Sequence, residues 1–372
     1  LSLVGSEMCI RDSDTPLQKA GGENNAWTSN DVTNYYTVVP THNAETAFWL
    51  ESDRMLSLAF SSEFLSVQKQ VVIEEFKQRN LNQPYGDSFL LLRPMAYRVH
   101  PYRWPVIGKN TSHIGNASLE EVKEFFFAHY APNNAILSIS GSLPFDEAIL
   151  LCEKWFAPIS RREVACRDLP QEPVQTKPHK KIVEREVPLD AIFKAYHMVD
   201  RKHPDYQGYD ALSDVLASGR SSRLYRRLVM EKKLFTEIDS SITGDIEPGL
   251  FLLKGKLSPG ISLEQGEEAI EMELRRMREE LLEQRELDKV INRFESNDLF
   301  SNLHYLNKAT NLAYYELLGG AENIDTEVEK YKKLTPFDLR RIAEKLFVPE
   351  NSSTLWYKSV HAKREIITDV SD

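Results

Sequence analysis

The chain has 372 residues, of which 41% are apolar and 27% charged, an ordinary composition for a globular protein with two domains of common size. Its net charge of −10 argues against a nucleic-acid partner, because phosphate binding requires clustered Lys and Arg. No apolar run approaches the length of a membrane span. Cys152 and Cys166, the cysteines outside the first 13 residues, are too few for a disulfide framework and do not indicate a compartment.

The first 13 residues, LSLVGSEMCIRDS, differ in character from the rest of the chain. They lack the basic start and the long apolar core of a signal peptide. We expect residues 1–13 to be a foreign segment joined to the chain, in preference to a genuine N-terminal extension.

The next part of the chain is expected to begin with a glycine turn at Gly21 and Gly22, which leads into a strand over residues 27–39 rich in Thr, Tyr and Val. An amphipathic helix over residues 45–60 comes next. A second helix carries Glu74 and Glu75. Neighbours on a helix lie about 100° apart, so only one of the two can point squarely into a site. By composition alone, both are interpreted as solvated surface carboxylates.

Further elements complete the first half. A helix is expected from Asp87 towards Tyr97, broken or kinked at Pro94. His100 precedes a proline in an extended stretch and is interpreted as a structural loop residue. The pattern predicts a capping box between Ser118 and Glu121 at the start of another helix, and then a short apolar strand over residues 135–140.

A linker with four prolines is predicted over residues 158–179, between an N-terminal domain over residues 14–157 and a C-terminal domain over residues 180–372. The C-terminal domain is expected to contain helices from Asp205, over 263–318 and from Thr335. Its strands are expected at 181–187, 191–199, 235–243, 250–256 and 354–358.

An internal repeat links the two halves. Residues 118–132 form a capped helix ending Tyr-Ala-Pro, then Asn-Asn and an apolar strand; residues 335–349 form a helix of the same length ending Phe-Val-Pro, then Glu-Asn and a strand. Because these two helix–strand segments lie on either side of the linker, they favour duplication of one ancestral domain.

Several blocks resemble one family of proteins. The strings GGENNAWTSNDVTNYY, LESDRM, VVIEEFKQR, HPYRWPVIG and YAPNNAILSISG occur in this order. They resemble the pitrilysin/insulin-degrading metallopeptidase family, and more narrowly its bacterial and mitochondrial-processing-peptidase branch. The resemblance covers most of residues 14–372. It implies an α+β fold of two related domains, each an antiparallel sheet with helices packed on one face.

The resemblance also implies a zinc site. In the family, a helix bearing H-x-x-E-H supplies two histidine ligands and a general-base glutamate, and a glutamate on a later helix is the third ligand. Here that third ligand falls on Glu75, whereas no two histidines of the sequence lie four residues apart. We therefore expect zinc in a full-length protein and its absence from this chain, which lacks the general base as well. Gln68 stands where the family often has a further glutamate.

A second departure concerns the Arg and Tyr that stabilise the tetrahedral intermediate in this family. Met230 occupies the Arg position, and Thr236 or Glu237 the Tyr position. None of these side chains can serve as the required oxyanion donor. The pattern resembles heterodimeric members of the family, in which a homologous partner subunit supplies the Arg and Tyr.

Asn25 and Ala26 match the family's edge-strand position, where an extended peptide or protein substrate adds to the sheet through main-chain hydrogen bonds. Without the resemblance, these residues would be interpreted as a turn-to-strand junction. The sequence thus predicts a zinc endopeptidase of the pitrilysin type, represented by a truncated and inactive fragment. The alternative is a non-catalytic partner or structural subunit with the same fold.

Overall fold

The structure is a computed structural model that describes residues 14–56, 60–164 and 168–360. The chain forms two compact units, and each half of the sequence contributes to both. The first comprises Leu1–Gln78, Pro105–Asp168 and Asp298–Asp325, and the second Arg79–Trp104, Leu169–Asn297 and Thr326–Asp372. The predicted domain boundaries stay a prediction, and residues 1–13 lie outside the described residues.

The first unit is mainly helical. Besides the strands β1 (Glu23–Thr28) and β2 (Thr33–Val38), it contains α2 (Asp14–Lys19), α3 (Ala44–Leu56), α4 (Ser62–Phe76), α6 (Thr111–Gly115), α7 (Leu119–His129), α8 (Phe145–Phe156) and α12 (Tyr305–Leu318). A π-helical turn, Lys77–Leu81, comes directly after α4. The predicted glycine turn lies between α2 and β1, where Gly21 has a φ of 71° that favours glycine.

The predicted single strand over residues 27–39 is wrong, because the chain reverses within it. β1 and β2 form an antiparallel hairpin in which Ala26 lies opposite Tyr35. The turn between them is closed by Ser29, whose hydroxyl oxygen accepts hydrogen bonds from the backbone N–H groups of Asp31 and Val32, both at 3.2 Å. This is the local side-chain bonding that makes Ser, Asn and Asp turn formers.

The predicted strand over residues 135–140 is also not formed. The segment is paired with no strand in the described part of the chain, and its apolar side chains stay exposed: Ile136 by 42%, Leu137 by 51% and Ile139 by 42%. A strand requires a neighbour for its backbone hydrogen bonds, and local composition cannot supply one.

The second unit is built on a five-stranded sheet in the order β3-β7-β4-β6-β5. The strands are β3 (His179–Arg185), β4 (Ala191–His197), β5 (Phe235–Ile242), β6 (Leu250–Leu257) and β7 (Ser352–Ser359). They confirm the five strands predicted for the C-terminal half to within a few residues. All neighbouring pairs are antiparallel except β3 and β7, which are parallel, so the sheet is mixed.

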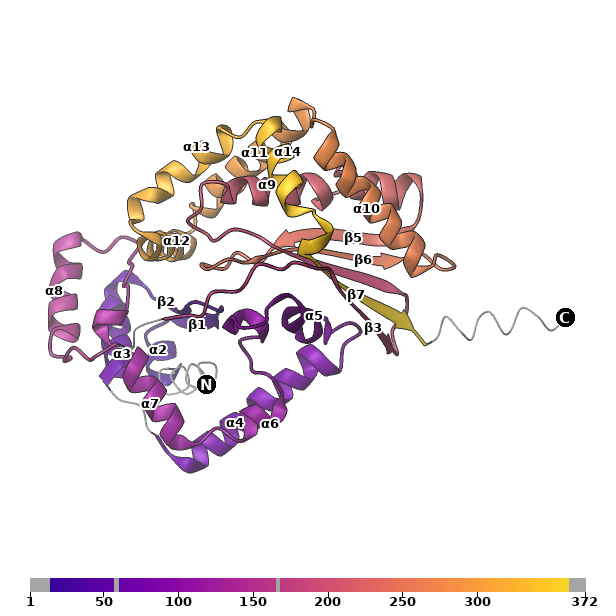
Figure 1. Ribbon diagram of the computed structural model, residues 1–372. Coiled ribbons are helices and arrows are strands. Elements are labelled where there is room, and N and C mark those ends of the chain that lie inside the picture. Colours follow the sequence, from indigo (N-terminus) through magenta and orange to yellow (C-terminus); the bar gives the residue numbers. More distant parts are fainter. Residues whose placement is uncertain (1–13, 57–59, 165–167, 361–372) are drawn as a thin grey trace. The chain divides into compact units, whose positions relative to one another are not determined.

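Helices cover both faces of this sheet (Figure 1). On one face lie α9 (Tyr206–Ala217), α10 (Leu263–Glu279) and α14 (Pro336–Leu346), which enclose side chains such as Ile192, Phe251 and Trp356. On the other face lies α5 (Ser88–Ala96), from the first half of the sequence, against Phe193 and Tyr357. α5 continues through Pro94, so the helix is not broken there. The remaining helices are α11 (Gln284–Ser301) and α13 (Glu327–Lys332).

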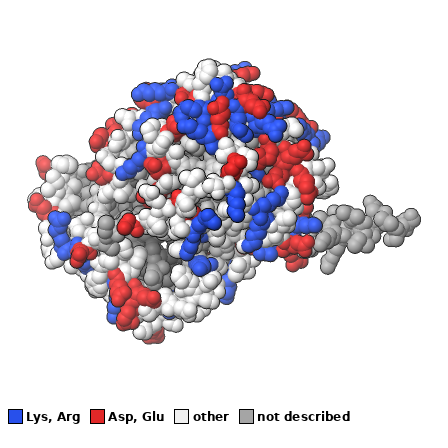
Figure 2. Space-filling view, viewed as in Figure 1, with Lys and Arg blue, Asp and Glu red and all other residues white. Residues whose placement is uncertain are grey.

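Within the described ranges, no helix is both long enough and apolar enough to span a membrane. On the face drawn in Figure 2, acidic and basic side chains are interspersed.

Candidate functional site

The predicted substrate-binding residues lie on β1. Asn25 is exposed and Ala26 half-buried, and they lie opposite Tyr36 and Tyr35 of β2. The backbone N–H of Ala26 donates a 2.8 Å hydrogen bond to Oδ1 of the Asn25 side chain. Opposed residues of an antiparallel pair alternate between hydrogen-bonded and non-hydrogen-bonded positions. The backbone N–H of Ser29 donates to the carbonyl of Val32 at 2.9 Å, so the pair Ala26 and Tyr35, three steps along the unbroken register, is a non-hydrogen-bonded position. The N–H of Ala26 therefore faces the outer edge of β1, away from β2.

The predicted metal ligand lies on α4, in the same compact unit as β1. Glu74 is exposed and forms a 2.6 Å ion pair with Lys77, whereas Glu75 is half-buried. The two neighbouring carboxylates therefore have different surroundings, as helical geometry requires. The assignment of Glu75 as a metal ligand, and of Asn25 and Ala26 as substrate contacts, stays a prediction.

The residues present do not fit a zinc ion. Among the described residues, no group of three or more His, Cys, Asp or Glu side chains is placed to hold a metal. Zinc sites in proteins need at least three such ligands, and Glu75 would supply one. Gln68, seven residues before Glu75 on the same helix, is buried and neutral. No step of a zinc-dependent reaction can be derived from these residues.

The stretch aligned with the family's Arg and Tyr lies in the second unit. Met230 belongs to a π-helical segment, Tyr225–Glu231, and is 58% exposed. Thr236 donates to the carbonyl of Lys256 at 3.3 Å, and Glu237 forms an ion pair with the side chain of Lys256 at 2.8 Å. An acidic side chain and a thioether cannot stabilise a developing oxyanion.

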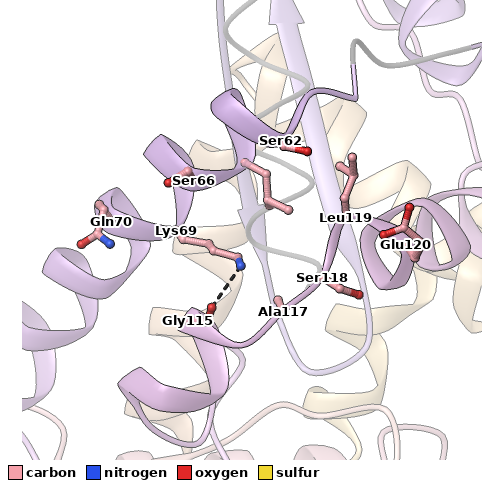
Figure 3. A pocket seen from close by; sticks show the side chains of 10 residues that line it. Ser62, Ser66, Lys69, Gln70, Gly115, Ala117, Ser118, Leu119 and Glu120 are labelled. Atoms are coloured by element: carbon pink, nitrogen blue, oxygen red, sulfur yellow. Dashed lines mark hydrogen bonds between the residues drawn. The ribbon is translucent and has the colours of Figure 1, made fainter.

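A cleft of about 410 Å³ lies in the first unit, between α4 and the segment that joins α6 to α7. Figure 3 shows Lys69 reaching across it, and its Nζ donates to the carbonyl of Gly115 at 3.0 Å. Its lining is largely polar and includes Ser62, Ser66 and Ser118, but neither Glu75 nor Asn25 and Ala26. The cleft is therefore separate from the predicted site.

The linker carries a residue that sequence analysis did not identify. The carboxylate of Glu172 accepts hydrogen bonds from the backbone N–H groups of Arg98, Val99 and His100, at 2.7 to 3.0 Å. Partial burial alone would raise its pKa, but these three donors hold the pKa below its ordinary value. Glu172 thus fixes the turn after α5 within the second unit. His100 belongs to this turn, which agrees with its interpretation as a structural residue.

Comparison with known proteins shows which proteins this chain is similar to. A model described as the Peptidase M16 inactive domain matches residues 116–294. The zinc protease PqqE of Helicobacter pylori is 29% identical over 350 residues, which cover 93% of this chain and 78% of that protein. The crystal structure of a protease from Helicobacter pylori superposes with a TM-score of 0.89 at 26% identity, covering 96% of this chain and 88% of the other. The chain is therefore similar to proteins of the M16 peptidase family over most of its length.

These similarities confirm the resemblance, and the mixture of helices and largely antiparallel sheet confirms the α+β fold class. A further relative, the uncharacterized zinc protease YmxG of Bacillus subtilis, is 23% identical over 94% of this chain and 84% of that protein. The matched inactive-domain model includes Met230, Thr236 and Glu237.

Proposed function

We propose that this chain is a zinc endopeptidase by descent that binds extended polypeptide but does not cleave it alone. Peptide would add to the outer edge of β1 through main-chain hydrogen bonds at Ala26. The main chain of Asn25 faces β2, so this exposed residue would contact the peptide through its side chain. Zinc would require Glu75 together with two histidines that this sequence lacks. The Arg and Tyr donors would come from a homologous partner subunit.

The observation that carries the binding proposal is the outward direction of the Ala26 N–H. In the described structure this N–H is satisfied by the Asn25 side chain, at 2.8 Å. A side-chain amide oxygen has the same acceptor chemistry as a peptide carbonyl. A bound strand would therefore replace one acceptor by another, at little cost in unsatisfied backbone groups.

A second candidate, a structural subunit with no peptidase role in any complex, is favoured by Met230 and the ion-paired Glu237 at the oxyanion positions. The coding sequence upstream of this chain separates the two. An intact H-x-x-E-H supports the peptidase lineage proposed here, and an altered version supports the structural subunit.

Binding is tested with fluorescein-labelled β-casein, a disordered polypeptide, by fluorescence anisotropy. We expect saturable binding without cleavage. Ala26→Pro removes the outward N–H, and proline is tolerated at an edge strand where the N–H faces solvent. We expect this variant to lose about 1 kcal/mol or more of binding free energy, roughly fivefold or more in Kd.

Ala26→Val is the matched control, because it alters the side chain but keeps the N–H, and it should bind as the parent does. Equal binding by the proline variant, with an unchanged melting temperature, would contradict strand addition at β1.

A further inference from the structure

The carboxylate of Glu172 lies in a site formed by backbone N–H groups. One carboxylate oxygen accepts from the N–H of Arg98 at 2.7 Å, and the other accepts from those of Val99 and His100 at 3.0 and 2.8 Å. Successive N–H groups that converge on one point form a concave anion site. Burial would raise the pKa of Glu172, yet these donors hold the pKa below its ordinary value. The three N–H groups, the carboxylate site, thus favour an ionised carboxylate.

The backbone around the carboxylate site is held in place by contacts that do not involve Glu172. Tyr97 and Tyr102, on either side of it, are 2% and 3% exposed. Their hydroxyls bond to the backbone of residues 247 and 248, just before β6, at 3.0 Å for Tyr97 and 3.2 Å for Tyr102. Arg103 also donates to the carbonyl of Arg98 at 2.9 Å. The site therefore keeps its shape without Glu172, and such preorganisation lowers the cost of binding another carboxylate.

The linker segment that carries Glu172 lies on the surface. The structure describes all of residues 169–178, and none of them is buried or belongs to a helix or strand. A second anchor of this segment is Gln175, whose Nε2 donates to the carbonyls of Glu350 and Ser352 at 2.9 and 2.8 Å. Segments with few buried apolar contacts open at low free-energy cost. Glu172 can therefore leave the carboxylate site without disruption of the sheet.

The sequence around the carboxylate site suits an incoming carboxylate. Residues 88–119 contain no Asp or Glu, although the chain has 56, and they include Arg93, Arg98 and Arg103. The side chain of Arg98 is exposed next to the site and attracts an anion. Val99 is 44% exposed and offers an apolar contact to the residue that carries the carboxylate. These surroundings favour a carboxylate on a peptide over an inorganic anion.

We propose that the carboxylate site binds a carboxylate of a polypeptide, and that Glu172 occupies it as an internal competitor in the free chain. Capture of a peptide carboxylate by backbone N–H groups is a known mode of recognition. The ligand is a C-terminus or an acidic side chain, because both present the same two oxygens. When it binds, Glu172 is displaced and residues 169–178 are released. The site is distinct from the outer edge of β1, which belongs to the first unit.

Binding of acetate to two variants tests the chemistry. Glu172→Ala removes the internal carboxylate. Glu172→Gln is the matched control, because glutamine keeps the size of glutamate and an amide oxygen as acceptor. In NMR spectra of Glu172→Ala, the backbone amide signals of residues 98–100 should shift saturably with sodium acetate but not with sodium chloride at equal ionic strength. Glu172→Gln should bind acetate at least about tenfold more weakly.

Peptides identify the source of the carboxylate. Acetyl-Ala-Ala-Val with a free C-terminus should shift the same amide signals in Glu172→Ala, and the same peptide with a C-terminal amide should not. Acetyl-Ala-Glu-Ala amide presents a side-chain carboxylate instead. The tighter binder of the two acidic peptides shows which source the site prefers. Addition of Ala26→Pro to Glu172→Ala should leave this binding unchanged, which separates the site from the outer edge of β1.

The parent chain tests the competition. Its affinity for the preferred acidic peptide should be at least about tenfold below that of Glu172→Ala, because the tethered carboxylate occupies the site. At saturation, the signals of residues 171–175 should move to the positions of an unfolded segment. Gln175→Ala removes the second anchor but keeps Glu172, and it should bind the peptide at least about threefold more tightly than the parent does.

The proposal is overturned if folded Glu172→Ala shows no shift of residues 98–100, or if it binds acetate no better than Glu172→Gln does. Equal binding of the free acid and the amide of both peptides would overturn it as well. If Glu172→Ala does not fold, the comparison of Gln175→Ala with the parent decides, and equal affinities of these two proteins contradict the proposed competition.

Discussion

Asp205 and Arg341 join the start of α9 to α14 through two hydrogen bonds, with Nη1 and Nη2 donating to the two carboxylate oxygens at 2.7 and 2.6 Å. The guanidinium holds the pKa of Asp205 below its ordinary value. A carboxylate with a lowered pKa stabilises the fold above its unfolded-state pKa of about 3.9, and this contribution is lost as the pH falls through the folded value.

Asp205→Asn should therefore be less stable than the parent at pH 7, and the difference should shrink below about pH 4. Arg341 is 41% exposed, so solvent screening limits the loss to about 1 kcal/mol or less. Urea unfolding at pH 7 and pH 3 measures it. A difference that does not change with pH would show that the pair contributes through packing instead.

The opposite pH dependence is expected at Asp210, also on α9. Burial raises the pKa of its carboxyl, even though the hydroxyl of Tyr331 donates to it at 2.5 Å. The folded state thus favours the protonated acid. Its contribution is complete below the unfolded-state pKa of about 3.9 and is lost as the pH rises through the folded value.

Asp210→Asn keeps an acceptor for Tyr331 but removes the titration. Its free energy of unfolding relative to the parent should rise between pH 4 and pH 8, by about 1.4 kcal/mol for each unit by which the pKa is raised. A flat or falling difference over this range would contradict the assignment.

The two aligned asparagines should differ in their contribution to stability. The side chain of Asn351 makes two hydrogen bonds to the backbone of His197 as well as one to Leu346, whereas the side chain of Asn134 makes only the corresponding bond to His129 in the described part of the chain. At about 1 kcal/mol for each bond, Asn351→Ala should lose about 2–3 kcal/mol and Asn134→Ala about 1 kcal/mol or less. If thermal unfolding shows equal losses of stability for the two variants, the hydrogen bonds between Asn351 and His197 do not stabilise β4.

Local features of the fold could be predicted from the sequence. The capping box of Ser118 and Glu121 and the helix start at Thr335 result from residue types at fixed spacing, and both are found. The prediction of one strand over residues 27–39 was wrong because it followed the high β-propensity of these residues. It missed the turn that the side chain of Ser29 closes. Residues 135–140 have strand composition, but strand formation depends on neighbours distant in sequence, as does the parallel pairing of β3 with β7.

The candidate site depended more heavily on resemblance. Helical geometry predicts that Glu74 and Glu75 face different surroundings, and the structure agrees, with Glu74 paired to Lys77 on the surface. Nothing in the spacing of these residues indicates a metal, because the histidine pair that would do so is absent from the sequence. The hydrogen bonds of Glu172 could not be predicted either. Their donors are three backbone N–H groups, which every residue except proline has, so the residue types do not indicate them.

We propose that Glu75 is one carboxylate of a zinc site and that this chain cannot hold the metal by itself. The direct test is zinc content by elemental analysis after dialysis against equimolar zinc, for the chain and for Glu75→Gln. We predict well under one zinc per chain for both proteins. A tight one-to-one site in the parent would contradict it, and loss of that site in Glu75→Gln would place the missing ligands around Glu75.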